Sequence, residues 1–526
     1  MRVLIFHGYL LEGTGSNVYN ARLAAALVAL GHDVHLLSQD RRPERLPFVD
    51  AVGDWDRGEL RVRAVEREQG GGRCTVYRPD IGGLLPVYVA DRYEGIDARP
   101  FAQCSEREVA RYVDANVAAV GDVLELARPD VALANHLVMG PAILARALAG
   151  AVPYAVKVHG SALEYTVKPA PERFLPFARE GLAGAGGVLV GSRHTAASLC
   201  EALGDRQLVA RTRLGPPGVD VARFTPLDPQ PAADALRALA TGLLAGDAQD
   251  DASVGDTSAF ARDARAAGAA LERLDPERDE LVAYVGKLIV SKGVDLLIAA
   301  WPLVLERVPR ARLAVVGFGA YRDGLERLRA ALVAGDLEQV RAVALAGSSL
   351  EGAPGPGRPL RHVLAFLDGL AGGERERYLA AARALDERVV FTGRLEHDEL
   401  AGLLPACAAA VMPSTFPEAF GMVAAEAAAC GAFPVSAAHS GLAEVSAALA
   451  RAVPQPAAAW LSFAVDDHAV RTLAANIADW LLADPQLRAR TRAGLVDAVR
   501  ARWSWEGVAR GVIAAARGRL DELPAP

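Results

Sequence analysis

The sequence predicts an α/β protein with two doubly wound domains. The chain of 526 residues exceeds one ordinary domain and has room for two domains with insertions. Segments with strand character alternate with segments with helix character twice along the chain, a pattern typical of parallel sheets covered by helices. We therefore expect two parallel sheets, one in each half of the chain.

The first domain is expected over residues 1–225. It begins with the strand Arg2–Phe6 and a loop containing Gly13 and Gly15, which precedes the helix Asn17–Leu30. Further strands are predicted at Asp33–Leu37, Val131–Ala134, Tyr154–Val158 and Gly187–Val190. The run Gly215-Pro216-Pro217-Gly218 then interrupts regular structure.

The second domain is expected over residues 279–500, and a closing helix over 501–526. It contains a predicted helix at Val294–Glu306 and predicted strands at Leu281–Val285, Arg312–Val316, Arg388–Phe391 and Ala409–Met412. Two stretches do not fit the alternation. Residues 228–278 lack strand signals and are interpreted as an insertion or linker, and residues 331–380, which hold a Gly/Pro stretch, as an inserted segment.

Composition excludes several classes of function. A net charge of −7 argues against nucleic acid as the principal partner, and it leaves open peripheral membrane contact through a local basic patch. Five scattered cysteines without a CxxC motif favour a reducing compartment and neither a disulfide framework nor a zinc site. The N-terminus reads as a strand, and no stretch of 18 apolar residues lacks a charge. We expect a cytoplasmic protein; the oligomeric state stays open.

Two glutamates separated by seven residues are the most informative feature of the chain. Glu418 follows Phe416-Pro417, which keeps the backbone out of the helical region, and Glu426 lies in the predicted helix Phe420–Cys430. Gly431 is suited to end that helix. Because a helix N-terminus presents unpaired N–H groups, an anion can bind there. A diphosphate at the helix N-terminus, with sugar hydroxyls on Glu418 and Glu426, would suit this site.

This segment resembles the Glu-x7-Glu signature of retaining, family 4-like glycosyltransferases with the GT-B fold. The flanking order from Pro413-Ser414 to Cys430-Gly431 matches as well, which leaves little weight for two merely solvated glutamates. The resemblance implies two Rossmann-like domains facing a central cleft and a final helix that crosses back to the first domain. It implies a nucleoside diphosphate sugar as donor substrate, a hydroxyl acceptor, no cofactor and no required metal.

Lysine is scarce, and its positions are informative. The chain has only Lys157, Lys168, Lys287 and Lys292, and all four lie beside two motifs. The segment Gly286–Gly293 resembles the family's Gly-Arg-Leu-x-x-x-Lys-Gly motif, with Lys287 in place of the usual arginine. Positioned cations stabilise the charge that grows on a departing diphosphate, so Lys287 and Lys292 are expected to bind it. Solvated lysines are the alternative.

In the first domain, His159 ends the predicted strand Tyr154–Val158 and is followed by Gly160. The resemblance places this histidine near the donor sugar. His7 and His136 also end strands; a structural role is favoured for them, although both could line the acceptor side. Gly15 is assigned to phosphate approach, with an ordinary strand–helix turn as the alternative.

Two further motifs complete the expected site. Gly393, Arg394 and Leu395 resemble the segment that reads the nucleobase through its backbone, and Phe420, Gly421 and Met422 open the helix that carries Glu426. Asp54-Trp55-Asp56 matches a metal motif of another glycosyltransferase fold. We expect it in a polar loop and assign it no role, so no metal site is predicted.

The predicted function is transfer of a hexose to a hydroxyl of a glycan, glycolipid or small molecule, with His159, Lys292 and Glu418 as catalytic residues. Two alternatives stay open. Glycogen or starch synthase-type enzymes share the fold, but they usually begin with a Lys-x-Gly-Gly loop, which is absent here. The second alternative is a non-catalytic protein that binds sugar nucleotides.

Overall fold

The structure is a computed structural model that describes residues 1–65, 71–89, 97–245, 262–352 and 357–526. The chain forms two compact units, Met1–Gly218 with Trp503–Pro526, and Val219–Arg502. It therefore passes from one unit to the other twice, after Gly218 and after Arg502. Within the described residues, no helix combines the length and apolar character needed to cross a bilayer.

The first unit contains a sheet with the strand order β11-β10-β9-β8-β1-β2-β5-β3-β4. Its strands are parallel except for the antiparallel pair β3–β4. The bounds are β1 Arg2–Phe6, β2 Asp33–Leu37, β3 Ala51–Asp56, β4 Glu59–Ala64, β5 Cys74–Arg78, β8 Val131–Asn135, β9 Tyr154–Val158, β10 Gly187–Val190 and β11 Thr212–Leu214. Leu84–Val87 (β6) and Asp97–Pro100 (β7) form a separate parallel pair.

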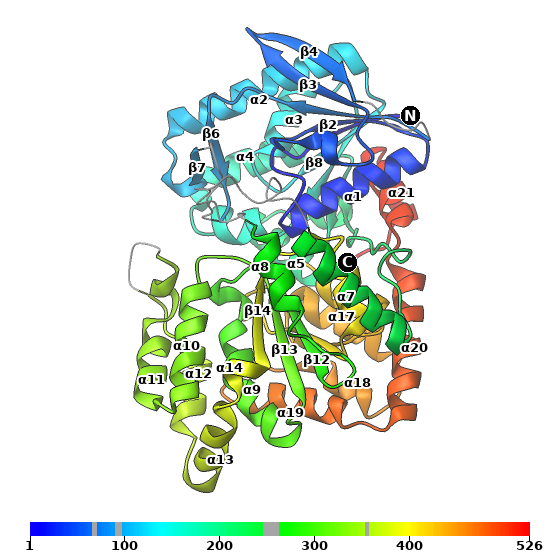
Figure 1. Ribbon diagram of the computed structural model, residues 1–526. Coiled ribbons are helices and arrows are strands. Elements are labelled where there is room, and N and C mark those ends of the chain that lie inside the picture. The colour runs from blue at the N-terminus through cyan, green and yellow to red at the C-terminus, as the bar shows by residue number, and fades with distance from the viewer. Residues whose placement is uncertain (66–70, 90–96, 246–261, 353–356) are drawn as a thin grey trace. The chain divides into compact units, whose positions relative to one another are not determined.

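Helices cover both faces of this sheet because its central strands are apolar on both sides. In β1, Val3 and Ile5 pack on one face, while Leu4 and Phe6 pack on the other. One face is covered by α1 and α21, which lie side by side (Figure 1), and the other by helices that include α2, α3 and α4. The helix bounds are α1 Gly15–Ala29, α2 Glu106–Ala127, α3 Gly140–Leu148, α4 Pro171–Ala183, α5 Arg193–Leu203, α6 Gln207–Arg211 and α21 Trp505–Ala516.

The second unit contains a parallel sheet with the order β14-β13-β12-β15-β16-β17. The strands are β12 Glu280–Val285, β13 Ala311–Val316, β14 Val389–Gly393, β15 Ala409–Met412, β16 Phe433–Ala437 and β17 Ser462–Phe463. Their carboxyl ends meet at one edge, where parallel α/β sheets form binding sites.

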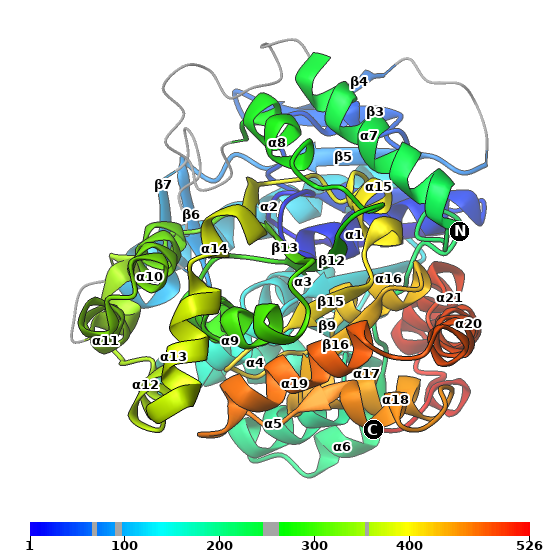
Figure 2. The ribbon, with the colours of Figure 1, turned by 60° about the horizontal axis from the view of Figure 1, so that its bottom comes forward.

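The helices of the second unit include α9 and α19, which lie side by side (Figure 2). The bounds are α7 Pro229–Ala245, α8 Ala264–Leu271, α9 Val294–Arg307, α10 Arg322–Ala334, α11 Leu337–Ala346, α12 Arg361–Asp368, α13 Gly372–Ala382, α14 Leu385–Arg388, α15 Leu400–Leu403, α16 Met422–Ala429, α17 Ser440–Ala450, α18 Ala457–Trp460, α19 Ala469–Leu481 and α20 Pro485–Arg502.

The α/β class with two parallel sheets is confirmed, and several predicted strands have the observed bounds, among them Asp33–Leu37 and Tyr154–Val158. The predicted helix Phe420–Cys430 is shorter, Met422–Ala429. Of the stretch 228–278, the described part forms α7 and α8, which pack on each other and belong to the second unit. Residues 246–261 and 353–356, parts of the two expected insertions, lie outside the described residues.

One local prediction was wrong. Asp54, Trp55 and Asp56 do not lie in a polar loop but form the end of β3. These three residues are partly exposed because the only strand beyond β3 is the edge strand β4, where solvent reaches the sheet. The Asp54 carboxylate accepts hydrogen bonds from Arg78 at 2.7 and 2.9 Å, so it has a structural partner.

Candidate active site

Glu418 lies in the loop between β15 and α16, at the carboxyl edge of the second sheet. Its backbone is held from both sides by the start of α17. The Glu418 amide donates to the Ser440 hydroxyl at 2.8 Å, and the Gly441 amide donates to the Glu418 carbonyl at 2.9 Å. His439 donates from Nε2 to the Ser414 carbonyl at 2.8 Å. The loop is therefore fixed by a segment more than twenty residues further along the chain.

The Glu418 carboxylate faces a cation from the loop that follows the neighbouring strand β12. It accepts hydrogen bonds from the Lys292 ammonium and from the Ser414 hydroxyl, and its side chain stays 25% exposed. Burial raises the pKa of Glu418. The charge and hydrogen bond of Lys292, together with the Ser414 hydroxyl, lower that pKa by more than burial raises it, so the net shift is downward. Glu418 is thus an ionised acceptor with part of its surface open to a ligand.

The loop after β12 presents both candidate lysines. Gly293 ends the short turn Val290–Lys292 with φ +67, and a Cβ there would lie 2.0 Å from the Pro413 carbonyl oxygen, so only glycine fits. This close approach brings Lys292 against the Glu418 loop. The Lys287 ammonium lies 6.0 Å from the centroid of the Phe318 ring, and the Arg394 guanidinium lies 5.7 Å from it. Lys287, Lys292 and Arg394 thus converge on the strand-end edge.

Helix α16 begins at Met422, four residues after Glu418, and carries the second glutamate. Its N-cap is Gly421, whose missing side chain leaves the first-turn amides without a side-chain cap, and Phe420 to Met422 are partly exposed. Glu426 is nearly buried, 3% exposed, and accepts a hydrogen bond from His397 Nε2 at 2.7 Å. His397 follows β14 four residues after Gly393, close to Leu395, and its ring lies 5.0 Å from Phe224. The sequence analysis did not find His397.

The first unit gathers three histidines at the ends of the neighbouring strands β1, β8 and β9. The ring of His136 lies 4.9 Å from His159 and 5.7 Å from His7. Asn135 donates its amide to the Phe6 carbonyl, which turns its Oδ1 toward His159 to accept from Nε2 at 2.8 Å. Burial lowers the pKa of all three, to about 4 for His7, and His136 and Lys157 lower that of His159 further. The three rings are therefore neutral at physiological pH.

The glycine loop of the first unit divides its roles between two residues. Gly13 has φ +87, a conformation that favours glycine, whereas Gly15 is the first residue of α1. Thr14 caps that helix without a side-chain hydrogen bond. Gly13 therefore makes the sharp turn of the loop. Gly15 and the residues after it supply the backbone amides at the start of α1.

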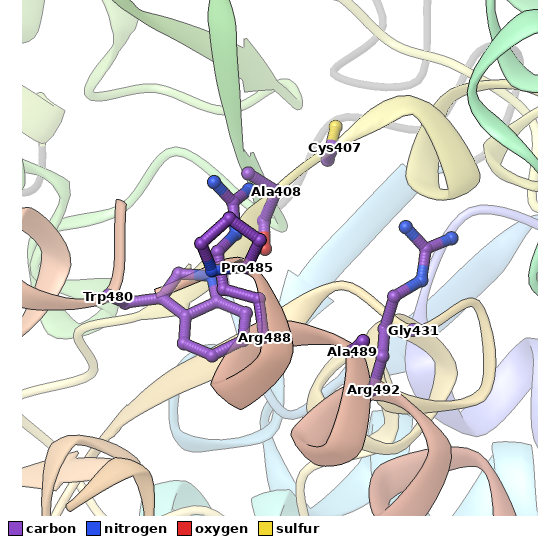
Figure 3. A pocket seen from close by; sticks show the side chains of 8 residues that line it. All are labelled: Cys407, Ala408, Gly431, Trp480, Pro485, Arg488, Ala489 and Arg492. Atoms are coloured by element: carbon purple, nitrogen blue, oxygen red, sulfur yellow. Dashed lines mark hydrogen bonds between the residues drawn. The ribbon is translucent and has the colours of Figure 1, made fainter. Parts of the chain in front are cut away.

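A hollow of about 280 Å³ in the second unit lies away from this site (Figure 3). It is found where β15 and β16 begin, at the opposite end of the strands from Glu418. Its arginines already have partners: Arg488 holds Glu280 at 3.0 Å, and Arg492 donates to the Leu227 carbonyl at 2.9 Å. None of the predicted site residues lines it. Within the described ranges, no group of three His, Cys, Asp or Glu side chains is placed to hold a metal ion.

Family models place the two Rossmann-like sheets and the Glu-x7-Glu loop in one class of protein, the glycosyltransferases that use a nucleotide sugar. A model of the Glycosyl transferase 4-like domain matches residues 14–215, and a model of Glycosyl transferases group 1 matches residues 363–494. The chain belongs to the group 1, family 4-like glycosyltransferases.

Curated relatives and solved structures agree with this assignment. A D-inositol 3-phosphate glycosyltransferase of Frankia alni is 27% identical over 494 residues, 90% of this chain and 97% of that protein. One from Segniliparus rotundus is 30% identical over 267 residues, but the match spans 50% of this chain and 45% of that protein.

The solved structures show the GT-B fold over nearly the whole chain. A sucrose-phosphate synthase from Thermosynechococcus elongatus has a TM-score of 0.56 and 18% identity, covering 99% of this chain and all of that one. Anabaena HepE, solved with UDP and glucose, has a TM-score of 0.55 and 16% identity, covering 98% of both chains.

Proposed function

We propose that the protein is a retaining glycosyltransferase that transfers a hexose from a nucleoside diphosphate sugar to a hydroxyl acceptor, which is a small polyol, a glycan or a glycolipid. The observation that carries the proposal is the Lys292–Glu418 pair at the opening of α16. It places an ammonium, an ionised carboxylate and free helix amides together, and these three groups match a diphosphate joined to a sugar.

Each group in the second unit receives a role. Lys287, Lys292 and the first amides of α16 bind the diphosphate, Glu418 accepts hydroxyl hydrogen bonds from the sugar, and Glu426 accepts them from the ribose. Gly393, Arg394 and Leu395 border the nucleobase. His159, from the first unit, orients the sugar as the resemblance implies; because it is neutral, it acts through hydrogen bonds rather than as a charged acid.

The reaction needs no covalent enzyme intermediate. The bond from the sugar C1 to the β-phosphate oxygen breaks, and a bond from C1 to the acceptor oxygen forms on the same face. The leaving phosphate oxygen takes the proton of the acceptor hydroxyl. Negative charge on the β-phosphate grows as its bond to C1 breaks, and Lys287, Lys292 and the helix amides are placed to stabilise that charge.

A donor screen tests the proposal. UDP-glucose and other UDP-hexoses come first, because HepE was solved with UDP-glucose, followed by GDP- and ADP-sugars. Inositol phosphates are the first acceptors, because the two curated relatives act on D-inositol 3-phosphate. We expect release of the nucleoside diphosphate with one donor class and faster release with an acceptor. Tight binding of a sugar nucleotide without any turnover would instead support a non-catalytic binding protein.

His397 offers a test of the nucleotide end of the site. His397→Ala should raise the Kd for the bare nucleoside diphosphate by about tenfold, because Glu426 would lose the hydrogen bond that orients its buried carboxylate. Calorimetric titration measures the effect, with His468→Ala, an exposed histidine of the same unit, as control. An unchanged Kd in His397→Ala would remove Glu426 from the ribose site.

A further inference from the structure

A lysine is buried in the first unit directly before His159. Lys157 is the fourth residue of β9 and is only 2% exposed. Within the described residues no carboxylate pairs with it, and burial lowers its pKa to about 7. Lysine is almost never fully buried without such a partner, because losing its hydration destabilises the fold. An apolar side chain would suit this position better for stability alone.

The contacts of Lys157 connect it to His159 through one aromatic ring. Residues alternate along a strand, so Lys157 and His159 both face the side of the sheet covered by α1 and α21. The Lys157 ammonium lies 5.4 Å from the centroid of the Tyr19 ring. The same ring meets His159 edge to face with centroids 5.0 Å apart. Tyr19 is itself buried, and its hydroxyl has no hydrogen-bond partner among the described residues, so the ring is held by packing and by the lysine.

Lys157 also fixes the segment where the chain leaves the first unit. Its ammonium donates to the Gly215 carbonyl at 2.6 Å, four residues before the second unit begins. The returning chain reaches the same cluster, because Trp505 at the start of α21 lies 5.6 Å from the Tyr19 ring. Gly218 packs so closely on Trp505 that a Cβ would lie 2.7 Å from its backbone nitrogen. The segment that leaves the first unit and the segment that returns to it thus both contact the cluster formed by Tyr19 and Lys157.

We propose that Lys157 is a positioning residue for His159: it holds the Gly215 carbonyl and the Tyr19 ring, and the Tyr19 ring in turn holds the imidazole against Asn135. The inference rests on the proposed function of His159. Replacing Lys157 by an apolar side chain should therefore raise stability and lower activity, whereas replacing an ordinary core residue lowers stability.

Lys157→Met removes the charge and the donor but keeps an unbranched side chain only one atom shorter. We expect kcat to fall by about ten- to a hundredfold, the effect of a misplaced group near the reacting atoms, with the donor KM within about twofold. Lys157→Gln keeps a donor for the Gly215 carbonyl and should recover part of the loss. Lys168→Met, the same change at an exposed lysine paired with Glu164, is the control and should leave kcat unchanged. Equal kcat values for wild type, Lys157→Met and Lys168→Met would overturn the proposal.

Stability supplies a readout that does not depend on activity. The folded-state pKa of Lys157 is about 7, below the ordinary value of 10.5, so its folded state binds fewer protons between these pH values. Wild-type stability should therefore rise with pH across this window, and the advantage of Lys157→Met should be largest at pH 7 or below and shrink toward pH 10. A Tm difference that does not change with pH would contradict the burial of this amine.

Nitrogen-15 NMR of labelled histidines tests the positioning role of Lys157 separately from the proposed function. If the wild type turns over no donor, the proposed function fails, while the positioning role is still decided by the His159 signal. We expect Lys157→Met to shift the His159 ring nitrogens and Lys168→Met to leave them in place. Unchanged His159 signals in Lys157→Met would contradict the positioning role whether or not the enzyme is active.

Discussion

Lys292→Ala is expected to lower kcat by about a hundredfold or more, the effect of removing one preorganised group that stabilises charge in a transition state. Lys292 is held in place by the close approach of Gly293 to Pro413 and by its contact with Glu418. Charge on the leaving diphosphate grows as its bond to C1 breaks, so the loss should fall on kcat as well as on donor affinity. Steady-state kinetics with the donor found in the screen measures both.

The control for Lys292 is Lys168→Ala, which removes an exposed lysine that pairs with Glu164 in the first unit. It should keep wild-type kinetics. Lys292→Arg should recover part of the activity, because a planar guanidinium supplies the charge but not the compact shape of an ammonium. A kcat of Lys292→Ala close to that of the control would exclude Lys292 from the diphosphate site.

Glu418→Gln is expected to reduce kcat by about ten- to a hundredfold, the value of a charge-assisted hydrogen bond felt in the transition state. Binding of the bare nucleoside diphosphate should stay within about twofold, because Glu418 is proposed to contact only the sugar. Kinetics and calorimetric titration give the two values. Glu376→Gln, an exposed residue of α13, is the matched control. A large loss of nucleotide affinity in Glu418→Gln would place this carboxylate elsewhere in the site.

The elements of the site that could be predicted are local in sequence. Strands such as Tyr154–Val158 are mostly apolar and are buried on both faces. His159 directly follows this strand, and the loop with Lys287 and Lys292 follows another predicted strand. Glu418 and Glu426 were found because their spacing spans one loop and one short helix. The fold class followed from the same alternation of buried strands and helices.

The missed residues act across long sequence separations. Ser440 and Gly441 hold Glu418 from the start of α17, and His397 reaches Glu426 from the turn after β14. No periodic pattern connects such segments, since only the packing of neighbouring strands brings them together. Strand β3, next to the edge strand β4, was missed because its second half, Asp54 to Asp56, is partly exposed and carries two aspartates. Lys157 was noticed as a rare lysine, but its burial follows from the helices that cover β9.

The stereochemistry of the first product tests the central claim most directly. Proton NMR can follow the reaction of the active α-linked nucleotide sugar, with an acceptor or with water, before the free sugar equilibrates. Reaction on the face from which the diphosphate departs predicts that the α-anomer appears first, and that Glu418→Gln slows its appearance without changing it. Initial formation of the β-anomer would contradict the retaining mechanism and the roles assigned to Lys292 and Glu418 in it.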